Sequence, residues 1–302
     1  MLHAKINSSR WKAHAAVLLT NIFFGANYSA VQYIARKGVP PFGLNVIRVG
    51  VSSVLFWLLI IIFKQKKWIK REHLPRFLLC AITGVVINQL LFIKGLTLTL
   101  SIHASLLILV TPIFITFIAA WIGKESLNIF KIFGLILGIS GSIILVLQKE
   151  STGAGSNILL GNILVILNAI SYAFYFVLVK PLMKEYHPFE VITWLFTLGF
   201  FFMLPIGWNE FFSIQWKALS STEYLVLGTI VFFATFLAYL FNLYGIAKLG
   251  ASVTGAYIYT QPIFAGLIAV FVMHEQLTAQ KLLAAALIVG GVLLVNKKSA
   301  TN

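Results

Sequence analysis

The chain has 302 residues, of which 60% are hydrophobic and only 10% are charged. A soluble domain carries roughly 45–50% apolar and about 25% charged residues. So much apolar surface cannot be buried in water, and lipid must therefore be the solvent. The formal net charge of +15 would suggest a nucleic-acid partner, but a membrane protein has its own reason to be basic.

Ten apolar segments follow one another along the chain, separated by links too short to hold a soluble domain. Each segment is close to the roughly 20 residues that an α-helix needs to cross a bilayer. We therefore predict an all-α integral membrane protein with ten transmembrane helices. The segments are 13–34, 42–63, 75–96, 101–122, 130–147, 158–181, 190–208, 222–246, 252–273 and 280–296.

The second half of the chain repeats the first. Residues 95–141 align with residues 245–291 at a constant offset of 150 and without a gap, and 12 of the 47 positions carry the same residue type. Self-similarity in an apolar chain indicates a transporter built from two repeats, which we place at 13–147 and 158–296. The matching positions are Gly95, Ile108, Pro112, Ile113, Phe114, Ile118, Ala119, Glu125, Leu127, Lys131, Leu137 and Gly141.

Each repeat holds five helices, and five is an odd number. The second repeat must therefore enter the membrane from the opposite side. The two repeats are then inverted, related by a pseudo-two-fold axis in the membrane plane. This arrangement permits alternating access, because each half can adopt the conformation of the other in turn.

Lysine and arginine are distributed unevenly over the links. With a cytoplasmic N-terminus, 16 of the 23 basic residues fall in inner segments and 5 in outer ones, while Arg48 and Lys94 fall within spans. The positive-inside rule then places both termini in the cytoplasm, for a multi-pass protein of the inner (plasma) membrane. It also explains the basic charge without nucleic acid. The five outer residues are Arg36, Lys37, Lys149, Lys217 and Lys281.

The predicted spans contain few titratable groups. The chain has no Asp, and its eight Glu residues map to links or helix ends, so a mid-membrane carboxylate relay is absent. No Ser/His/Asp set, metal-ligand cluster or phosphate loop is present, and we predict neither a cofactor nor enzyme activity. His103 is the one histidine expected inside the membrane. Transport is predicted either to be uncoupled or to use His103 as its titrating group.

Neutral polar side chains gather on single faces of several segments. Asn21, Tyr28 and Gln32 fall within one quadrant of the first helix. Asn168 and Tyr175 match Asn21 and Tyr28 at an offset of 147. Interhelical hydrogen bonding accounts for any one of these residues, but their convergence in both halves favours a polar cavity. The predicted cavity residues are Asn21, Tyr28, Gln32, Asn88, Gln89, Asn168, Tyr172, Tyr175, Asn242, Tyr257 and Gln261.

Pro112 and Pro262 lie near the middle of the fourth and ninth segments. Proline lacks an N–H and clashes with the carbonyl four residues back, so the carbonyls of Ile108 and Ile258 are expected to be free. Paired interruptions at corresponding positions point to the site of a transporter. We predict both prolines as hinges, with a simple packing kink as the alternative.

Two further features have a structural and a functional interpretation. Arg48 lies just inside the outer end of the second segment, where it either extends to the membrane surface or attracts anionic groups. Gly134, Gly138 and Gly141 line one face of the fifth segment. Small residues at this spacing allow helices to approach closely, which favours packing over a substrate contact.

Several short stretches carry a resemblance to a known family. They are Phe23-Phe24-Gly25-Ala26-Asn27-Tyr28, Pro40-Pro41-Phe42 with Arg48, and the TPIF…GKESL and QPIF…HEQL stretches around Pro112–Leu127 and Pro262–Leu277. On these, the chain resembles the EamA type of the drug/metabolite transporter superfamily over nearly its whole length. Phe24 replaces the Trp of a common Trp-Gly pair, and the turn Gly-Glu survives as Gly123-Lys124-Glu125 and Met273-His274-Glu275.

The resemblance implies a ten-helix inner-membrane carrier. Its first to fourth and sixth to ninth helices would surround a central cavity, with the fifth and tenth outside it. Family members typically export amino acids, related metabolites or drugs.

We predict an alternating-access secondary transporter that exports small neutral or zwitterionic metabolites, such as amino acids, related compounds or drugs. An uptake carrier or lipid-linked flippase is the alternative within transport, and a membrane sensor or scaffold is the alternative outside it. The expected partners are a small-molecule substrate and the lipid bilayer. The sequence leaves a homodimer open.

Overall fold

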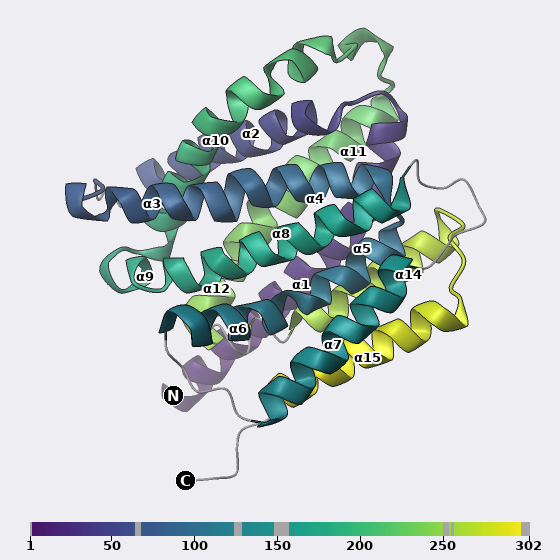
Figure 1. Cartoon of the computed structure of the whole chain (residues 1–302). Coiled ribbons are helices and arrows are strands. Elements are labelled where there is room, and N and C mark those ends of the chain that lie inside the picture. Colours follow the sequence, from purple (N-terminus) through teal and green to yellow (C-terminus); the bar gives the residue numbers. More distant parts are fainter. Residues whose placement is uncertain are drawn as a thin grey trace.

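The computed structural model describes residues 2–63, 68–123, 129–147, 157–249, 254 and 257–296, and these residues contain helices and no β-strand. Lys124, Glu125 and Lys149 lie outside the described residues. In chain order (Figure 1) the helices are α1 (Leu2–Arg36), α2 (Pro41–Ile62), α3 (Leu74–Ala81), α4 (Ile87–Leu98), α5 (Ser101–Leu107), α6 (Thr111–Gly123), α7 (Ile129–Leu147), α8 (Ile158–Val179), α9 (Leu182–Glu185), α10 (Pro188–Ser213), α11 (Ser221–Val231), α12 (Ala238–Leu249), α14 (Gln261–Phe271) and α15 (Ala279–Asn296).

Six helical stretches are long and apolar enough to cross a membrane. Three shorter apolar helices, Ile129–Leu145, Tyr257–Phe271 and Ala279–Leu294, fall on the predicted fifth, ninth and tenth segments, and α1 covers the first. The all-helical membrane class is thus confirmed, and the count of ten spans stays a prediction. The six stretches are Pro41–Ile62, Arg71–Leu98, Ser101–Ile122, Ile158–Glu185, Pro188–Ser213 and Ser221–Gly245.

The helices pair across the two halves in matching sets. α4 packs against α8, and the equivalent helix α12 packs against α1. In the same way α6 packs against α8, and α14 packs against α1. The remaining close pairs, α2 with α10 and α7 with α15, join each helix to its own counterpart. The contacts between the two halves thus come in matching sets.

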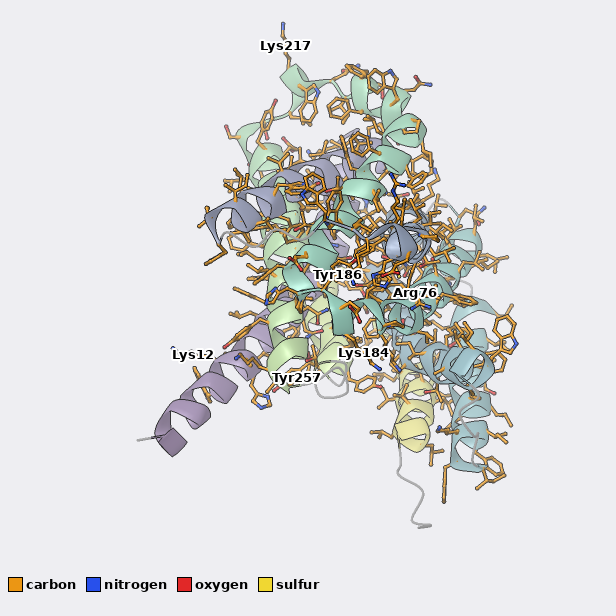
Figure 2. The ribbon with its side chains drawn as sticks, turned by 90° about the vertical axis from the view of Figure 1, so that its left-hand side faces the viewer. Lys12, Arg76, Lys184, Tyr186, Lys217 and Tyr257 are labelled. Atoms are coloured by element: carbon orange, nitrogen blue, oxygen red, sulfur yellow. The ribbon has the colours of Figure 1, made fainter. Side chains whose placement is uncertain are left out.

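The two ends of the bundle carry different links. The starts of α1 and α3 lie with α9 at one end, on the left of Figure 1, and the link from α10 to α11 lies at the other. Figure 2 looks onto the first end, where Lys12, Arg76 and Lys184 are labelled. Lys217 belongs to the opposite link, after α10. Three of the basic residues predicted to be inner, Lys12, Arg76 and Lys184, therefore share one end of the molecule.

Glycines allow the closest helix pairs to form. A Cβ atom placed on Gly291 of α15 would lie 2.6 Å from both the carbonyl oxygen of Gly134 and the amide nitrogen of Gly138 on α7. A Cβ atom on Gly207 of α10 would lie 2.6 Å from the carbonyl oxygen of Phe42 on α2. Side chains at these positions would meet backbone that cannot rotate away. The glycine face predicted on the fifth segment is the face that packs.

Glutamates of the second half cap helices of the first. Glu210 accepts hydrogen bonds from the amides of Phe42, at 2.6 Å, and Gly43, at 3.1 Å, in the first turn of α2. Glu275 accepts from the amides of Ser101, at 2.9 Å, and Ile102, at 3.0 Å, at the start of α5. These amides have no partner within their own helices. The two carboxylates therefore join the second half to the first where α2 and α5 begin.

The helices are interrupted at equivalent places. A π-helical segment occupies Ile82–Val86 between α3 and α4, and another occupies Phe232–Leu237 between α11 and α12, starting 150 residues later. A 3₁₀ segment at Ile108–Val110 precedes α6, and another at Tyr257–Thr260 precedes α14. The π segments have no obvious residue signature, and the sequence did not predict them. Such breaks often mark functional positions in helices.

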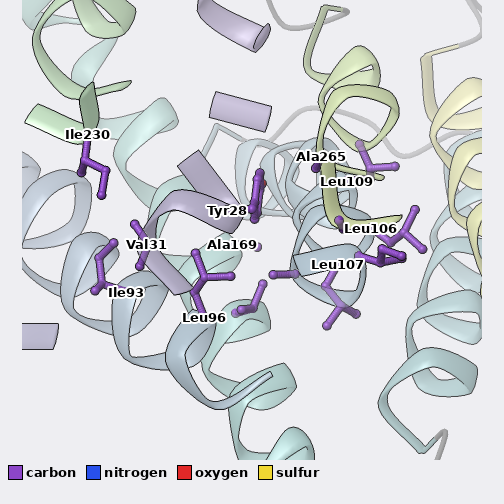
Figure 3. Packing of buried hydrophobic residues seen from close by; sticks show 14 of the residues in the cluster. Tyr28, Val31, Ile93, Leu96, Leu106, Leu107, Leu109, Ala169, Ile230 and Ala265 are labelled. Carbon is purple, nitrogen blue, oxygen red and sulfur yellow. The ribbon is translucent and has the colours of Figure 1, made fainter. Parts of the chain in front are cut away.

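The apolar core surrounds the middle of the bundle. One cluster joins α1, α4, α5, α8 and α14, and Figure 3 shows Tyr28 and Val31 packed near Ile93, Leu96 and Ala169. A second cluster joins α2, α3 and α10. Polar side chains of the same helices are left to face a shared space between the two halves.

Candidate substrate cavity

A cavity of about 100 Å³ lies between the two halves. A single water needs roughly 10–15 Å³ on this measure, so the space suits a small molecule of several non-hydrogen atoms. Its walls come from α1, α2, α4, α6, α8, α12 and α14. The lining residues are Thr20, Asn21, Phe24, Asn27, Tyr28, Arg48, Asn88, Gln89, Phe92, Ile108, Thr111, Asn168, Tyr172, Phe176, Tyr239, Asn242, Thr254, Ile258 and Gln261.

Most residues predicted to form a cavity are brought together here. Asn21 and Tyr28 come from the first segment, and Gln261 comes from the ninth. Gln261 Nε2 donates to Asn21 Oδ1 at 2.9 Å, and the Tyr28 hydroxyl donates to Gln261 Oε1 at 3.3 Å. These bonds hold one wall in a defined arrangement. The predicted cavity residues on the lining are Asn21, Tyr28, Asn88, Gln89, Asn168, Tyr172, Asn242 and Gln261, and Arg48, predicted as a possible anion site, lies there too.

The opposite wall contains a contact between equivalent positions. Gln89 of the first half corresponds to Tyr239 of the second at an offset of 150, and Gln89 Nε2 donates to the Tyr239 hydroxyl at 2.8 Å. Asn168 Nδ2 donates to the carbonyl oxygen of Asn88 at 2.7 Å. Asn and Gln side chains therefore do form hydrogen bonds between helices here. These hydrogen bonds use the side-chain nitrogens. The side-chain oxygens Gln89 Oε1 and Asn168 Oδ1 have no hydrogen-bond partner among the described residues.

Arg48 lies in the wall of the cavity and is 2% exposed. Its Nε donates to Thr235 Oγ1 in the second π segment at 3.0 Å, and Thr235 donates to the Ile230 carbonyl. Its Nη1 has no partner among the described residues. Extension of this side chain to the membrane surface, one of the two sequence interpretations, is wrong because packing against the π segment holds it inside.

Three predicted cavity residues lie away from this lining. Gln32 Nε2 donates to the carbonyl oxygens of Leu96, at 3.1 Å, and Thr99, at 2.6 Å, nearer the end of the bundle. Tyr175 packs against Gly84, with its ring stacked on Tyr172 behind the wall. Helical periodicity assigned these residues to the correct face but not to the correct depth.

Tyr257 is the third predicted cavity residue that lies away from the lining. Its hydroxyl hydrogen-bonds His14 Nδ1 at 2.8 Å, two residues after Lys12 in α1. It therefore joins α1 to the second half outside the cavity.

The predicted hinge and proton-site residues are separate from the cavity. Neither Pro112 nor Pro262 lines it, although Ile108 and Ile258 four residues earlier do. The expectation of a free Ile108 carbonyl is wrong, because the Thr111 hydroxyl donates to it at 2.6 Å. His103 is fully buried, with Nδ1 at 3.2 Å from Asn162 Nδ2, and is not part of the lining.

The sequence missed several lining residues. Thr111 and Gln261 are equivalent at an offset of 150, as are Phe92 and Asn242. The two members of each pair differ in residue type, so a search for identical residues in the two halves does not find them. Alignment of the two halves at the offset of 150 would have placed them opposite one another. The missed residues are Thr20, Phe24, Asn27, Phe92, Ile108, Thr111, Phe176, Tyr239, Thr254 and Ile258. The described part of the chain contains no group of three His, Cys, Asp or Glu side chains suited to a metal ion.

A cavity between two equivalent helical halves defines a membrane carrier, and comparison with known proteins gives the family. The model of the EamA-like transporter family matches residues 11–147 and again residues 159–297. The chain belongs to the EamA-like transporter family.

Individual relatives are distant but match almost end to end. An uncharacterized transporter of Archaeoglobus fulgidus is 26% identical over 95% of this chain and 99% of its own. A probable terminal-alkyne amino-acid exporter of Streptantibioticus cattleyicolor is also 26% identical, over 95% of this chain and 94% of its own. One crystal structure has the same fold, with a TM-score of 0.63 and 17% identity over 96% of both chains.

Proposed function

We propose that the protein is an alternating-access secondary transporter that exports small neutral or zwitterionic metabolites, amino acids or related compounds foremost. One observation carries the proposal: both halves contribute equivalent positions to a single cavity lined by aromatic, apolar and neutral polar side chains. Thr111 with Gln261, and Gln89 with Tyr239, face the same space. A scaffold has no need of such a space.

The proposed topology is ten spans in two inverted repeats, 13–147 and 158–296, in the inner membrane with cytoplasmic termini. The matched helix pairs and the matched π and 3₁₀ segments support it. A reporter fused after Asn302 is expected in the cytoplasm, and one inserted at Thr152 is expected outside. A cytoplasmic signal at position 152 would end the inverted-repeat argument.

Alternating access requires contacts that open in turn at the two ends. At the proposed outer end, Glu223 accepts from the Tyr33 hydroxyl at 3.0 Å and lies 3.6 Å from Lys37 Nζ. At the other end, His14 bonds Tyr257. Each pair joins α1 to the second half, so rocking of one half against the other would break one pair and keep the other.

In this proposal the cavity side chains orient the substrate. Tyr28 and Tyr172 supply aromatic surface with a polar edge, and Asn21, Asn168 and Gln261 supply amide groups. Pro112 and Pro262 act as flex points just behind the lining, with His103 as the one candidate titrating group inside the membrane. The relative named as a probable amino-acid exporter supports export and this substrate range.

The test is transport by purified protein in liposomes. Asn168→Leu keeps the size of the side chain but removes the amide in the wall. We expect inserted, folded protein with transport reduced at least about tenfold, since a buried polar contact is worth about 1–3 kcal/mol. Gln215→Leu, which removes an exposed amide outside the cavity, is the matched control. Full transport by the Asn168 variant would assign Asn168 to helix packing alone.

A further inference from the structure

A second space, larger than the central cavity, lies on the outside of the bundle between α14 and α15. Its volume is about 640 Å³, and α5 contributes its floor with residues such as Leu106. The side chains along its edges are largely exposed: Ile263 is 60% exposed, Leu267 is 51% exposed and Leu282 is 55% exposed. The residues that line this space and those that line the central cavity do not overlap. We call it the α14–α15 groove, and it opens on a surface of large apolar side chains.

The equivalent place in the first half is closed. Ile113 of α6 corresponds to Ile263 of α14 at the offset of 150. Ile113 is fully buried, because its side chain lies directly against Gly138 of α7. The space beside α6 and α7 is about 240 Å³, against about 640 Å³ beside α14 and α15. The wide groove is therefore a property of the second half, although both halves carry the same isoleucine.

The groove offers hydrocarbon to a ligand. Of its 16 lining residues only Ser105, Tyr259 and Lys281 have polar side chains. The Ser105 hydroxyl donates to the Ile102 carbonyl oxygen at 2.9 Å, and Lys281 Nζ donates to the Gln276 carbonyl oxygen at 2.7 Å. These two polar ends are directed at the backbone. A ligand of the groove is thus bound through its apolar surface, and its polar group lies outside.

The length of the groove matches one leaflet of a bilayer. Its lining follows the ninth segment from Tyr259 to Phe271, which is roughly 18 Å at 1.5 Å per residue. Half of a hydrocarbon core is about 15 Å thick. An extended apolar chain of one leaflet can therefore lie along the groove over its depth in the membrane.

A second copy of the protein fits this surface less well. Helices associate in lipid by close packing at small residues, because lipid tails are as apolar as leucine and give no hydrophobic drive. The edge of the groove presents Ile263, Leu267 and Phe271, which are all large. A flexible chain can fill an irregular space between two helices without a matching surface.

We propose that the α14–α15 groove binds an acyl chain of a membrane phospholipid. This inference goes beyond the proposed transport function, because such binding does not require that any solute be transported. It also places a lipid against the cavity wall. Gln261 lines the central cavity, and its neighbour Pro262 lines the groove. A bound acyl chain therefore packs on the outer side of the turn whose inner side holds Asn21 and Tyr28 through Gln261.

The first experiment locates lipid on the unmodified full-length protein. The protein is reconstituted in vesicles of phosphatidylcholine and phosphatidylglycerol that include a phosphatidylcholine with a diazirine in its acyl chain. After illumination, labelled positions are mapped by mass spectrometry.

The reference for this labelling is the exposed face of α2, where Val54 is 60% exposed and Leu58 is 49% exposed. We expect residues of the groove to be labelled at least about threefold more often than this face, because a chain between helices contacts protein on more sides than a chain on an open surface. Equal labelling of both surfaces would show ordinary surrounding lipid and overturn the inference.

The second experiment fills the groove. A Cβ atom on Gly266, which lines the groove, has no atom within 4 Å, so the side chain of Gly266→Leu occupies the space of the acyl chain. Gly228 of α11 also has no atom within 4 Å of its Cβ position and lies outside the groove, which makes Gly228→Leu the matched control. Ala285→Leu fills the groove from α15 and is the second variant if Gly266→Leu does not fold.

We expect filling to lower the labelling of the groove at least about threefold, since dispersion contacts are lost where a side chain replaces the acyl chain. Labelling of the α2 face should stay constant, and Gly228→Leu should behave as the unmodified protein. Undiminished labelling of the groove in a folded, filled variant overturns the inference.

The oligomeric state separates lipid from a second copy. Mass photometry of the unmodified protein and of Gly266→Leu should give the same mass. A dimer that Gly266→Leu dissociates, together with a groove that carries no lipid label, would assign the groove to a second copy and overturn the inference. None of these measurements depends on transport, so the lipid site and the transport function stand or fall separately.

Discussion

The two halves of the molecule share the order of their main helices and differ in chemistry where they face the cavity. Their π and 3₁₀ segments lie at equivalent places, but Arg48 of α2 has no equivalent cation, because Leu195 stands 147 positions later in α10. Likewise Gln89 faces its equivalent Tyr239. In the proposed mechanism, equivalent elements allow the two halves to exchange conformations. Asymmetric side chains let the cavity bind a substrate that is not itself symmetric.

The sharpest way to break this comparison is at Gln261 and its equivalent Thr111. Gln261→Leu removes the partner of both Asn21 and Tyr28. Two buried polar groups lose their bonds, and we expect kcat/KM for transport to fall about thirtyfold or more. Thr111→Val removes one bond to a neighbouring carbonyl and is expected to cost about two- to fivefold. Equal losses in both variants would mean that the halves contribute alike.

Substitution of Gly291 tests how closely helices of the two halves must pack. A side chain in Gly291→Ala meets the backbone of Gly134 and Gly138 on α7, whereas the nearest atom to a Cβ atom on Gly290 is Leu137 Cδ2 at 3.3 Å. Overpacking costs about 1–3 kcal/mol, so thermal melting should show clear destabilisation for Gly291→Ala and little for Gly290→Ala. A stable Gly291 variant would show that α7 and α15 separate more easily than the glycine contact suggests.

The two prolines sharpen the comparison further. Pro262→Ala supplies an N–H for the Ile258 carbonyl and should join the 3₁₀ segment to α14, stiffening it. We expect the turnover number to fall about fivefold, the effect of about 1 kcal/mol, with KM unchanged. Pro112→Ala should do less, because the Ile108 carbonyl already accepts from Thr111. Unchanged turnover in both variants, measured on properly inserted protein, would make the kinks architectural.

The sequence predicted the helices well because lipid demands long apolar runs, and within the described residues each predicted segment overlaps helix. It also found the cavity face of α1, since Asn21 and Tyr28 stand out among apolar neighbours. It could not give depth along a helix. Gln32 and Tyr257 share the predicted faces but bond near the ends of the bundle.

What the sequence missed depends on long-range geometry. Tyr239 enters the site by accepting a hydrogen bond from Gln89 of the other half, and no local sequence pattern indicates this contact. Thr235 positions Arg48 only because a π segment turns it inward. Repeats preserve backbone shape more than residue type, so the second member of a functional pair is often a different amino acid.

Substitution of His103 is expected to have the smallest effect on transport, and it compares a residue outside the cavity lining with residues of the lining. Sequence reasoning left two choices, uncoupled transport or titration of His103. The side chain is fully buried, pairs with Asn162 and lies outside the cavity lining. Its charge state then has no direct contact with a bound substrate, which favours uncoupled transport. We expect His103→Gln, which keeps a hydrogen-bonding group for Asn162, to transport within about twofold of the unmodified protein, because the side chain lies outside the cavity lining. The rate should be measured between pH 5.5 and 8, with Asn168→Leu as the cavity control.

Loss of a pH dependence present in the unmodified protein would instead identify His103 as the titrating group, acting on the cavity through α5 and the 3₁₀ segment at Ile108–Val110.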